Sequence, residues 1–250
     1  MTRVSGPEPP NPRSPARNPV RNPVRHHLLP LVVDVNDLAC LVVGAGPVGT
    51  RRVRSLLAAG AAVTVVAPHI GDGVRRLLDR SGRAPGPLTV LARPYLPPEA
   101  SDYRLVVSAT GDPAVDAQVV ADAVAGGALV NRADTDGAGD GAPGAVSFPA
   151  VHRDGPVTVA VSTGGSGPGL ASWLRDRAAA ALGPDLAVLA GLVDEARAEL
   201  LARGRAGASV DWGSVLDQVA PLVASGRSDD ARVLLGRLVD GSGAAHPGPS

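Results

Sequence analysis

The chain has 250 residues, of which 44% are hydrophobic, 19% charged and 2% aromatic, and its formal net charge is zero. This composition fits a globular protein with a Val/Leu/Ala core and gives no basic or acidic surplus that would attract nucleic acid or a membrane surface. All 24 lysine and arginine positions are arginine, which excludes a catalytic Schiff-base lysine and a P-loop lysine. Cys40 is the one cysteine, so we expect no intramolecular disulfide and no metal site built on cysteine.

The amino-terminal part of the chain has the composition of an unstructured extension. Residues 1–27 are rich in Pro, Arg, Asn and Ser and carry too little apolar surface to offset the entropy of ordering. The apolar tract 28–33 predicts an edge strand, since proline is tolerated at a sheet edge. No stretch is long and apolar enough for a membrane span, and the first residues lack the apolar core of a signal peptide, so a cytoplasmic protein is expected.

An apolar run at 38–43 leads into a Gly-x-Gly-x-x-Gly turn made by Gly44, Gly46 and Gly49, and a helical pattern follows the turn. Strand, tight turn and helix start in this order place backbone N–H groups and the positive end of a helix against a pyrophosphate. The motif therefore predicts a dinucleotide site. The acidic residue that usually follows the second strand is missing, so NADP stays open beside NAD, with His69, Arg75 or Arg76 as contacts for a 2′-phosphate.

Short Val-rich runs alternate with helical stretches through the next part of the chain. Strands are predicted at 62–66, 88–91, 104–109 and 128–131, and a helix is predicted to begin after Asp112 and to run to about 125. Alternating strands and helices of this length are typical of a doubly wound α/β fold with a Rossmann-type parallel sheet. We expect this NAD-binding domain to span 28–143.

The pattern changes after residue 143. Two runs, 145–151 and 156–161, flank an Asp-Gly turn signal and predict a β-hairpin with its turn at 152–155. A helix at 169–182 completes this hairpin region, 144–182. Amphipathic helical segments follow in a region from 183 to 240, and 241–250 form a tail.

Two further segments have the residue types of a binding or catalytic site. Asn131-Arg-Ala-Asp134 follows the fifth strand, at the edge where open α/β sheets bind ligands, and Asp134 is either an acid, a base or a metal-touching carboxylate, or a turn-forming aspartate. The Ser/Thr/Gly-rich loop 162–168 precedes a helix and is either an anion-binding nest or a simple helix cap.

These features, in this order, resemble the precorrin-2 dehydrogenase family, which includes the amino-terminal module of sirohaem synthase and stand-alone dehydrogenase/ferrochelatases. The resemblance depends on the Leu-Pro-Leu entry and the GAGPVG turn, on Asn131-x-x-Asp134, and on Ser147-Phe-Pro-Ala followed by Val159-Ala-Val-Ser-Thr-Gly-Gly. It implies oxidation of precorrin-2 to sirohydrochlorin with NAD, a homodimer built through the hairpin region, and in some members insertion of Fe²⁺. The loop 135–145 is longer and richer in glycine than is usual in the family.

The resemblance also assigns roles to residues. It implies Asp134 as the key residue for dehydrogenation, acting as a general base when a proton leaves with the hydride. A polycarboxylate substrate suits charge-assisted bonds from arginine and from backbone N–H groups. The implied cofactor contacts are Gly44, Gly46, Pro47, Val48, Gly49, Pro68 and His69, and the expected substrate contacts are Asn131, Arg132, Arg153, Thr163, Gly164, Gly165 and Arg175.

Two other functions fit parts of the sequence. A non-catalytic NAD-sensing regulatory module would explain the glycine turn and a dimer, but it gives no reason for Asn131-x-x-Asp134 followed by the Ser-Thr-Gly-Gly turn. A short-chain dehydrogenase is disfavoured, because its Tyr-x-x-x-Lys pair cannot exist in a chain without lysine.

Overall fold

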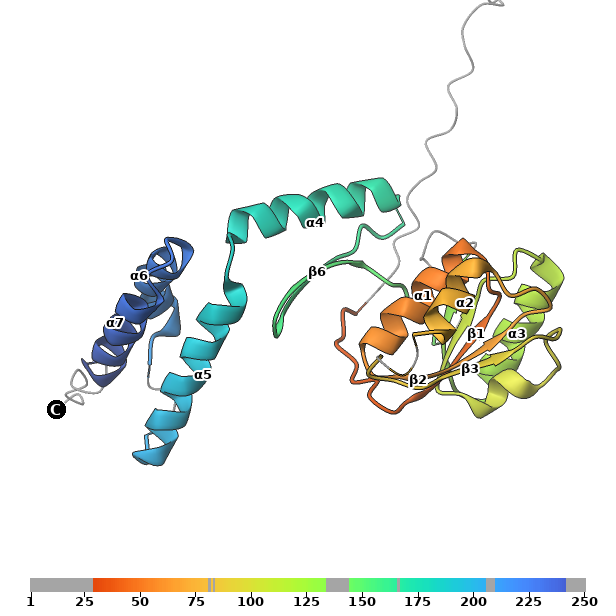
Figure 1. Ribbon diagram of the computed structural model, residues 1–250, viewed down its shortest axis with the longest axis horizontal. Coiled ribbons are helices and arrows are strands. Elements are labelled where there is room, and N and C mark those ends of the chain that lie inside the picture. The colour runs from red at the N-terminus through yellow and green to blue at the C-terminus, as the bar shows by residue number, and fades with distance from the viewer. Residues whose placement is uncertain are drawn as a thin grey trace, which may run out of the picture.

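The computed structural model describes residues 29–80, 82, 84–133, 144–165, 167–205 and 210–241. The predicted extension 1–27, residue 28, Asp134 and residues 242–250 of the tail lie outside this described part. Figure 1 shows a sheet domain at one end, an arm made of a hairpin and a helix, and a helical unit at the other end.

A parallel sheet of five strands forms the first domain, in the order β3-β2-β1-β4-β5. This order reverses between β1 and β4, which is the topological switch point where dinucleotides bind in such folds. The Rossmann-type sheet expected from the sequence is thereby confirmed. The strands are β1 (Ala39–Val43), β2 (Ala62–Val66), β3 (Leu88–Leu91), β4 (Leu105–Ser108) and β5 (Leu129–Arg132).

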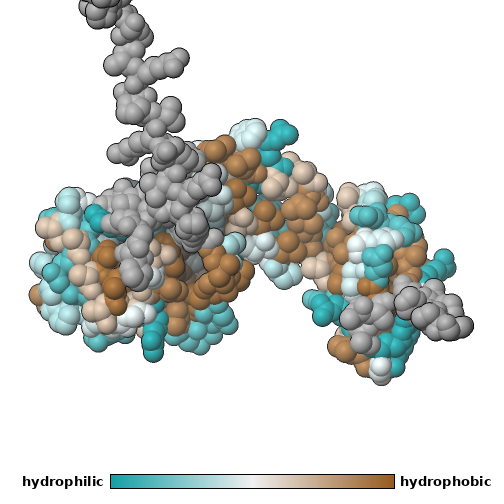
Figure 2. All heavy atoms as spheres, turned by 180° about the vertical axis from the view of Figure 1, so that it is seen from behind, coloured by the Kyte–Doolittle hydropathy of each residue, from teal (hydrophilic) through white to brown (hydrophobic). Residues whose placement is uncertain are grey.

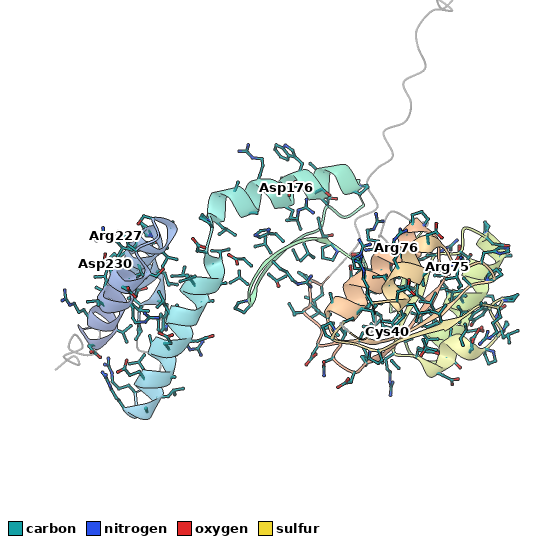
Figure 3. The ribbon with its side chains drawn as sticks, viewed as in Figure 1. Cys40, Arg75, Arg76, Asp176, Arg227 and Asp230 are labelled. Carbon is teal, nitrogen blue, oxygen red and sulfur yellow. The ribbon has the colours of Figure 1, made fainter. Side chains whose placement is uncertain are left out.

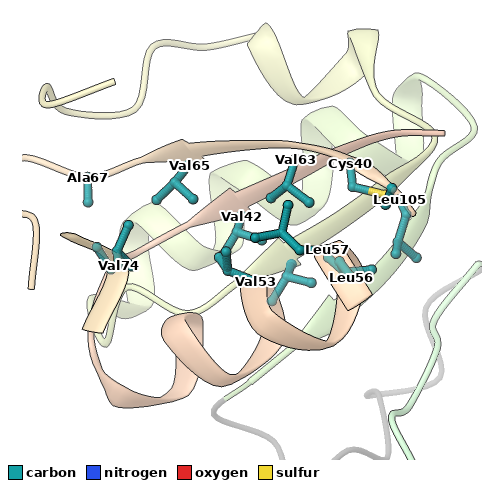
Figure 4. Close-up of a cluster of buried hydrophobic side chains, with 13 residues drawn as sticks. Cys40, Val42, Val53, Leu56, Leu57, Val63, Val65, Ala67, Val74 and Leu105 are labelled. Carbon is teal, nitrogen blue, oxygen red and sulfur yellow. The ribbon is translucent and has the colours of Figure 1, made fainter. Parts of the chain in front are cut away.

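Helices cover both faces of this sheet (Figure 1), so its strands are apolar on both sides. One face packs against α1 and α2 through Val53, Leu56 and Val74, and Figure 4 shows this cluster, which also contains the buried Cys40. The other face packs against α3 and the short 3-10 helix η2. The bounds are α1 (Pro47–Ala58), α2 (Asp72–Leu78), η2 (Glu99–Asp102) and α3 (Pro113–Ala125).

Helix α3 begins where the sequence predicts. The Asp112 side chain accepts hydrogen bonds from the backbone N–H groups of Ala114, at 2.9 Å, and Val115, at 3.3 Å, and Pro113 takes the first helical position. An N-cap carboxylate and a proline at this position both favour a helix start, because they use backbone positions that would otherwise lack a partner.

The edge strand predicted at 28–33 is wrong for the part of it that the structure describes. Residues 29–33 form no strand, and Leu29, Leu31 and Val32 are exposed. A strand needs a free sheet edge, and β1, the nearest strand in the sequence, already lies between β2 and β4. The tract therefore cannot pair beside β1, and it pairs with neither edge strand, β3 or β5, in the described chain.

The hairpin exists, but its limits differ from the prediction. Strands β6 (Ala150–Asp154) and β7 (Val157–Val161) pair antiparallel, with Asp154 opposite Val157, so the turn is Gly155-Pro156 and not 152–155. Gly155 has φ 54°, which suits the first central position of a type II′ turn, and the fixed φ of proline suits the second. The preceding residues 145–149 lie outside the hairpin, and Ala145 makes one parallel bridge to Val130.

Four helices follow the hairpin, and the last three have a core of their own. Helix α4 packs on both hairpin strands, whereas α5, α6 and α7 bury Leu200, Val219 and Leu235 among themselves. Their bounds are α4 (Pro168–Leu182), α5 (Leu186–Ala202), α6 (Trp212–Ala224) and α7 (Ser228–Gly241). Over the described ranges, none of the helices has the length and apolar character needed to cross a membrane.

Candidate dinucleotide and active site

Glycine occurs at the three positions of the turn between β1 and α1 for different structural reasons. Gly44 has φ 108°, and a Cβ there would lie 2.2 Å from the carbonyl oxygen of Ala109 on the neighbouring β4 segment. A Cβ on Gly49 would lie 2.1 Å from the carbonyl oxygen of Gly44. Gly46, in contrast, has no heavy atom within 4 Å of its Cβ position. The first and third glycines are required by packing, and the middle one faces open space.

The start of α1 offers backbone donors to that open space. Gly46 is the N-cap, it is extended, and no side chain caps the helix. The first N–H groups of a helix have no partner inside it, and here Pro47 has no N–H, so those of Val48 and Gly49 can donate to a ligand. Together with the positive end of the helix dipole, these donors fit a pyrophosphate. The predicted cofactor contacts around Gly44–Gly49 thus lie together.

The loop after β2 forms the next wall of this site. A Cβ on Gly71 would lie 2.6 Å from the carbonyl oxygen of Ala45, so the loop 67–71 packs directly against the glycine turn. Pro68 and His69 are exposed on this loop, beside the turn, as the resemblance implies. Between β2 and α2 there is no carboxylate, and the first acidic residue, Asp72, is already in α2.

Arginines on α2 lie close in sequence to this wall. Arg75 and Arg76 are exposed on the helix (Figure 3), and the backbone N–H of Arg75 donates to the carbonyl of Gly71. A ribose 2′-phosphate needs cationic partners and no neighbouring carboxylate. The residues of this wall therefore exclude neither form of the dinucleotide.

We expect the protein to bind both NAD⁺ and NADP⁺. The double variant R75Q/R76Q should lower the affinity for NADP⁺ about tenfold, because it loses charge-assisted bonds to the 2′-phosphate. NAD⁺ affinity should stay within about twofold, since NAD⁺ has no 2′-phosphate for these arginines to hold. Fluorescence titration of both dinucleotides measures this, with R54Q, an exposed arginine of α1, as the matched control. Equal weakening of both dinucleotides would contradict the prediction.

At the end of β5, Asn131 connects the sheet to the segment that enters the hairpin. It is 1% exposed, and its Nδ2 donates to the carbonyl oxygen of Val146 at 2.9 Å. Its Oδ1 is buried and has no hydrogen-bond partner among the described residues. Val146 in turn donates its backbone N–H to Val130 at 2.7 Å. One end of the Asn131 side chain is thus used for structure, and the other is buried without a partner among the described residues.

Two further candidate residues, Arg132 and Asp134, follow Asn131 in the chain. Arg132 ends β5 opposite Ser108 and makes an interaction of its own. Asp134, the predicted catalytic residue, lies two residues beyond, outside the described part of the chain. Its position relative to the glycine turn therefore remains a prediction. What the structure does give is the carboxyl edge of β5 from which it follows.

A cation-π contact joins α1 to the same segment. The guanidinium of Arg52 lies 4.3 Å from the ring centroid of Phe148, two residues before β6. Its Nε is buried without a hydrogen-bond partner in the described chain, and burial, followed by the nearby charge of Arg51, lowers the pKa of Arg52 below its usual value. Cation-π contacts gain strength where water is excluded, so this pair helps to hold the segment before the hairpin against α1.

A buried polar cluster at the end of β4 was not predicted from the sequence. The carboxylate oxygen Oδ1 of Asp116, on α3, accepts from the hydroxyls of Ser108, at 2.5 Å, and Thr110, at 2.8 Å, and from the backbone N–H of Thr110, at 3.2 Å. Asp116 is 2% exposed and Ser108 is fully buried. The cluster fixes the β4–α3 turn, which is the neighbour of Gly44.

The expected substrate contacts of the hairpin region do not lie together. Thr163, Gly164 and Gly165 form the turn between β7 and α4, at the end of the arm nearest the sheet domain (Figure 1). Arg153 lies near the hairpin tip, in a hollow of about 520 Å³ that the start of α5 helps to line. The Nε of Arg175 donates to Asp176 on the exposed side of α4. The described chain does not bring Arg153 and Arg175 to the glycine turn.

Comparison with known proteins agrees with this architecture. Residues 31–150 match a family model described as "Putative NAD(P)-binding", and residues 154–179 match one described as "Sirohaem biosynthesis protein central". These two segments follow one another directly, so the chain is similar to sirohaem biosynthesis proteins that contain an NAD(P)-binding domain. The resemblance seen in the sequence is thereby confirmed, and the dinucleotide expected at the glycine turn is NAD(P).

Two relatives that match most of the chain are longer proteins. A siroheme synthase of Methylococcus capsulatus is 36% identical over 212 residues, which are 83% of this chain and 42% of that protein. One of Pseudomonas entomophila is 36% identical over 222 residues, 86% of this chain and 45% of that protein. The chain therefore spans less than half the length of these two relatives.

A solved structure shares the fold over most of the chain. It is named SirC, a precorrin-2 dehydrogenase, and it aligns with a TM-score of 0.60 at 22% identity. The alignment covers 86% of this chain and all of that one. The sheet domain, hairpin and carboxy-terminal helices thus form one known arrangement.

Proposed function

We propose that this protein oxidises precorrin-2 to sirohydrochlorin with NAD⁺, as a step of sirohaem biosynthesis. The observation that carries the proposal is the order of two features along one sheet edge: an open glycine turn at β1, and the Asn131 segment at the end of β5 that leads into the hairpin. A regulatory nucleotide sensor needs the first feature only. The relatives named siroheme synthase and the fold relative named precorrin-2 dehydrogenase support the same choice.

The described residues have separate tasks in this reaction. NAD⁺, when bound, supplies the hydride acceptor. The N–H groups at the start of α1 hold its pyrophosphate, and the packed loop 67–71 bounds its adenosine side. The buried amide of Asn131 keeps the carboxyl end of β5 and the hairpin entry in fixed register.

The substrate side of the reaction needs anion donors and a proton acceptor. The turn at Thr163, Gly164 and Gly165 lies at the end of the arm nearest the sheet domain (Figure 1), and its backbone N–H groups are the proposed donors to substrate carboxylates, with Arg132 as a further donor. Oxidation removes a hydride and a proton, and Asp134 is the proposed base for the proton. Arg153 and Arg175 stay predicted substrate contacts; they reach such a substrate only from a second subunit or after movement of the arm.

An anaerobic assay tests the proposed reaction. The full chain is given precorrin-2 with and without NAD⁺, and formation of sirohydrochlorin and NADH in equal amounts is the expected result. NAD⁺ binding without turnover of precorrin-2, together with NAD-dependent binding of another protein, would instead favour a regulatory module. Adding Fe²⁺ to sirohydrochlorin without NAD⁺ tests the separate prediction of chelatase activity, for which only the uncatalysed rate would be a negative result.

We also propose that the protein is a homodimer joined through the hairpin region, working in the cytoplasm. Helix α4 exposes Leu170, Trp173 and Leu174 at 45%, 57% and 36%, which share one face of the helix, although α4 already packs on the hairpin. Figure 2 shows hydrophobic side chains over the arm between the two ends of the molecule. A contiguous apolar surface of this kind is typical of a protein interface. We keep 28–143, 144–182 and 183–240 as the proposed units of the chain.

A charge placed on this surface is expected to separate the subunits. The W173E variant should elute as a monomer in size-exclusion chromatography with light scattering, because burying the carboxylate in the interface costs desolvation even when Arg177, one turn later, pairs with it. V233E is the matched control, since Val233 is similarly exposed, at 54%, but lies on α7. A monomeric wild-type protein, or an unchanged W173E dimer, would contradict the proposed interface.

A further inference from the structure

Asp116 is a buried carboxylate whose hydrogen bonds do not explain its charge. Three donors converge on Oδ1, and all of them are neutral groups of Ser108 and Thr110. No arginine or histidine of the described residues forms an ion pair with it. An amide oxygen in the same place would accept the same bonds at a lower desolvation cost. The place of Asp116 in the first turn of α3 stabilises its charge through the helix dipole, and a charge buried at this edge also acts on a ligand bound beside it.

The cluster lies on the side of the dinucleotide site away from the adenosine. In a doubly wound sheet the ribose of the adenosine half lies at the end of β2 and the pyrophosphate at the start of α1. The nicotinamide half then extends across the switch point toward β4. Ser108 pairs with Val43 in the strand register, and Ala109 packs on Gly44. The Asp116 carboxylate is hydrogen-bonded to Ser108, so it lies next to the carboxyl ends of β1 and β4.

We infer that Asp116 sets the preference of the site between the two redox forms of the cofactor. The nicotinamide ring of NAD⁺ carries a positive charge and that of NADH does not. A buried negative charge under the nicotinamide half stabilises the oxidised form, because the interaction is weakly screened inside the protein. Arg132, opposite Ser108 in the register, contributes a positive charge to the same edge, and it is unchanged in the comparison below.

This inference rests on the dinucleotide site and deepens the proposed function, since a site that favours NAD⁺ also releases NADH after the hydride transfer. It concerns cofactor binding alone. The inference about Asp116 can therefore fail while the proposed oxidation of precorrin-2 is correct, and the proposed oxidation can fail while the inference about Asp116 is correct. For that reason the test uses no tetrapyrrole.

The dissociation constants of NAD⁺ and NADH are measured for the full chain and three variants by fluorescence titration and calorimetry. D116N removes the charge and keeps an acceptor oxygen, and we expect it to shift the ratio of the two constants toward NADH by about three- to tenfold. S108A removes one hydrogen bond to the carboxylate, T110V removes another together with the two bonds between the Thr110 hydroxyl and the Asp112 backbone, and both variants keep the charge. They should weaken both forms by the same factor and leave the ratio unchanged.

The wild-type protein supplies a second test, in case D116N does not fold. We expect it to bind NAD⁺ at least as tightly as NADH. Tighter binding of NADH by several-fold in the wild type, an unchanged ratio in a folded D116N, or an equal shift of the ratio in S108A would each overturn the inference.

Discussion

Replacement of Asp134 by alanine should lower the rate of precorrin-2 oxidation by about two to four orders of magnitude, the range typical for loss of a general base. The affinity for NAD⁺ should not change, because the described cofactor contacts belong to the glycine turn and the loop 67–71. The rate is followed anaerobically through NADH absorbance, and the affinity through protein fluorescence. This pair of readouts separates a lost base from a lost cofactor.

The matched control is D136A, in the same segment two residues later. It removes a carboxylate of the same type from the same loop, so it should keep most of the activity. Full turnover by D134A would remove Asp134 from its proposed role. A similar loss in both variants would mean that the loop, and not one carboxylate, determines the rate.

Two alanine substitutions in the glycine turn are expected to have opposite consequences. At Gly44 a methyl group meets the carbonyl oxygen of Ala109 at 2.2 Å, on a backbone with φ 108°. G44A should therefore destabilise the fold by about 2–4 kcal/mol. At Gly46 the Cβ position is open, so G46A should lower the stability by no more than about 1 kcal/mol, the cost of alanine at a helix N-cap. The methyl group then occupies space that the pyrophosphate needs, and the affinity for NAD⁺ should fall at least about tenfold.

Denaturant unfolding and dinucleotide titration of the two variants, run side by side, measure these effects. Each variant serves as the control for the other, since the chemical change is the same. If G46A bound NAD⁺ as well as the wild type, the pyrophosphate would not lie at the start of α1. If G44A were as stable as the wild type, the close approach of β4 would be tolerant of a side chain.

The part of the fold that the sequence predicts well is the part where several local signals agree. The strand before Gly44, the turn and the helix after it have matching periodicity, glycine spacing and helix-start chemistry. The helix after Asp112 is similar, because its cap and its proline can both be read from the sequence. These elements occur where they were expected.

The wrong predictions concern segments whose structure depends on partners distant in sequence. The tract 29–33 has strand propensity, but the sequence does not say whether a sheet edge is free for it. In the hairpin, Asp154-Gly155 marks the correct neighbourhood, but the pairing of Asp154 with Val157 shifts the turn by about two residues. The register there depends on cross-strand packing, which composition does not contain.

The candidate site follows the same division. The glycine turn could be predicted, whereas the cluster around Asp116 was missed. An aspartate in the first turn of a helix is common, because it interacts favourably with the helix dipole, and so Asp116 attracts no notice in the sequence. Its spacing of three from Val119 does place it on the buried stripe of α3, and this spacing is the signal that could have found it.

Helix α1 touches both halves of the proposed chemistry. Its first turn offers the donors for the pyrophosphate, and one and a half turns later Arg52 rests on Phe148, at the root of the arm. Because both contacts belong to one rigid helix, a displacement of α1 changes cofactor binding and the position of the hairpin together. A substitution that weakens the contact of Phe148 with Arg52 should consequently change the dinucleotide affinity as well as the position of the hairpin and α4.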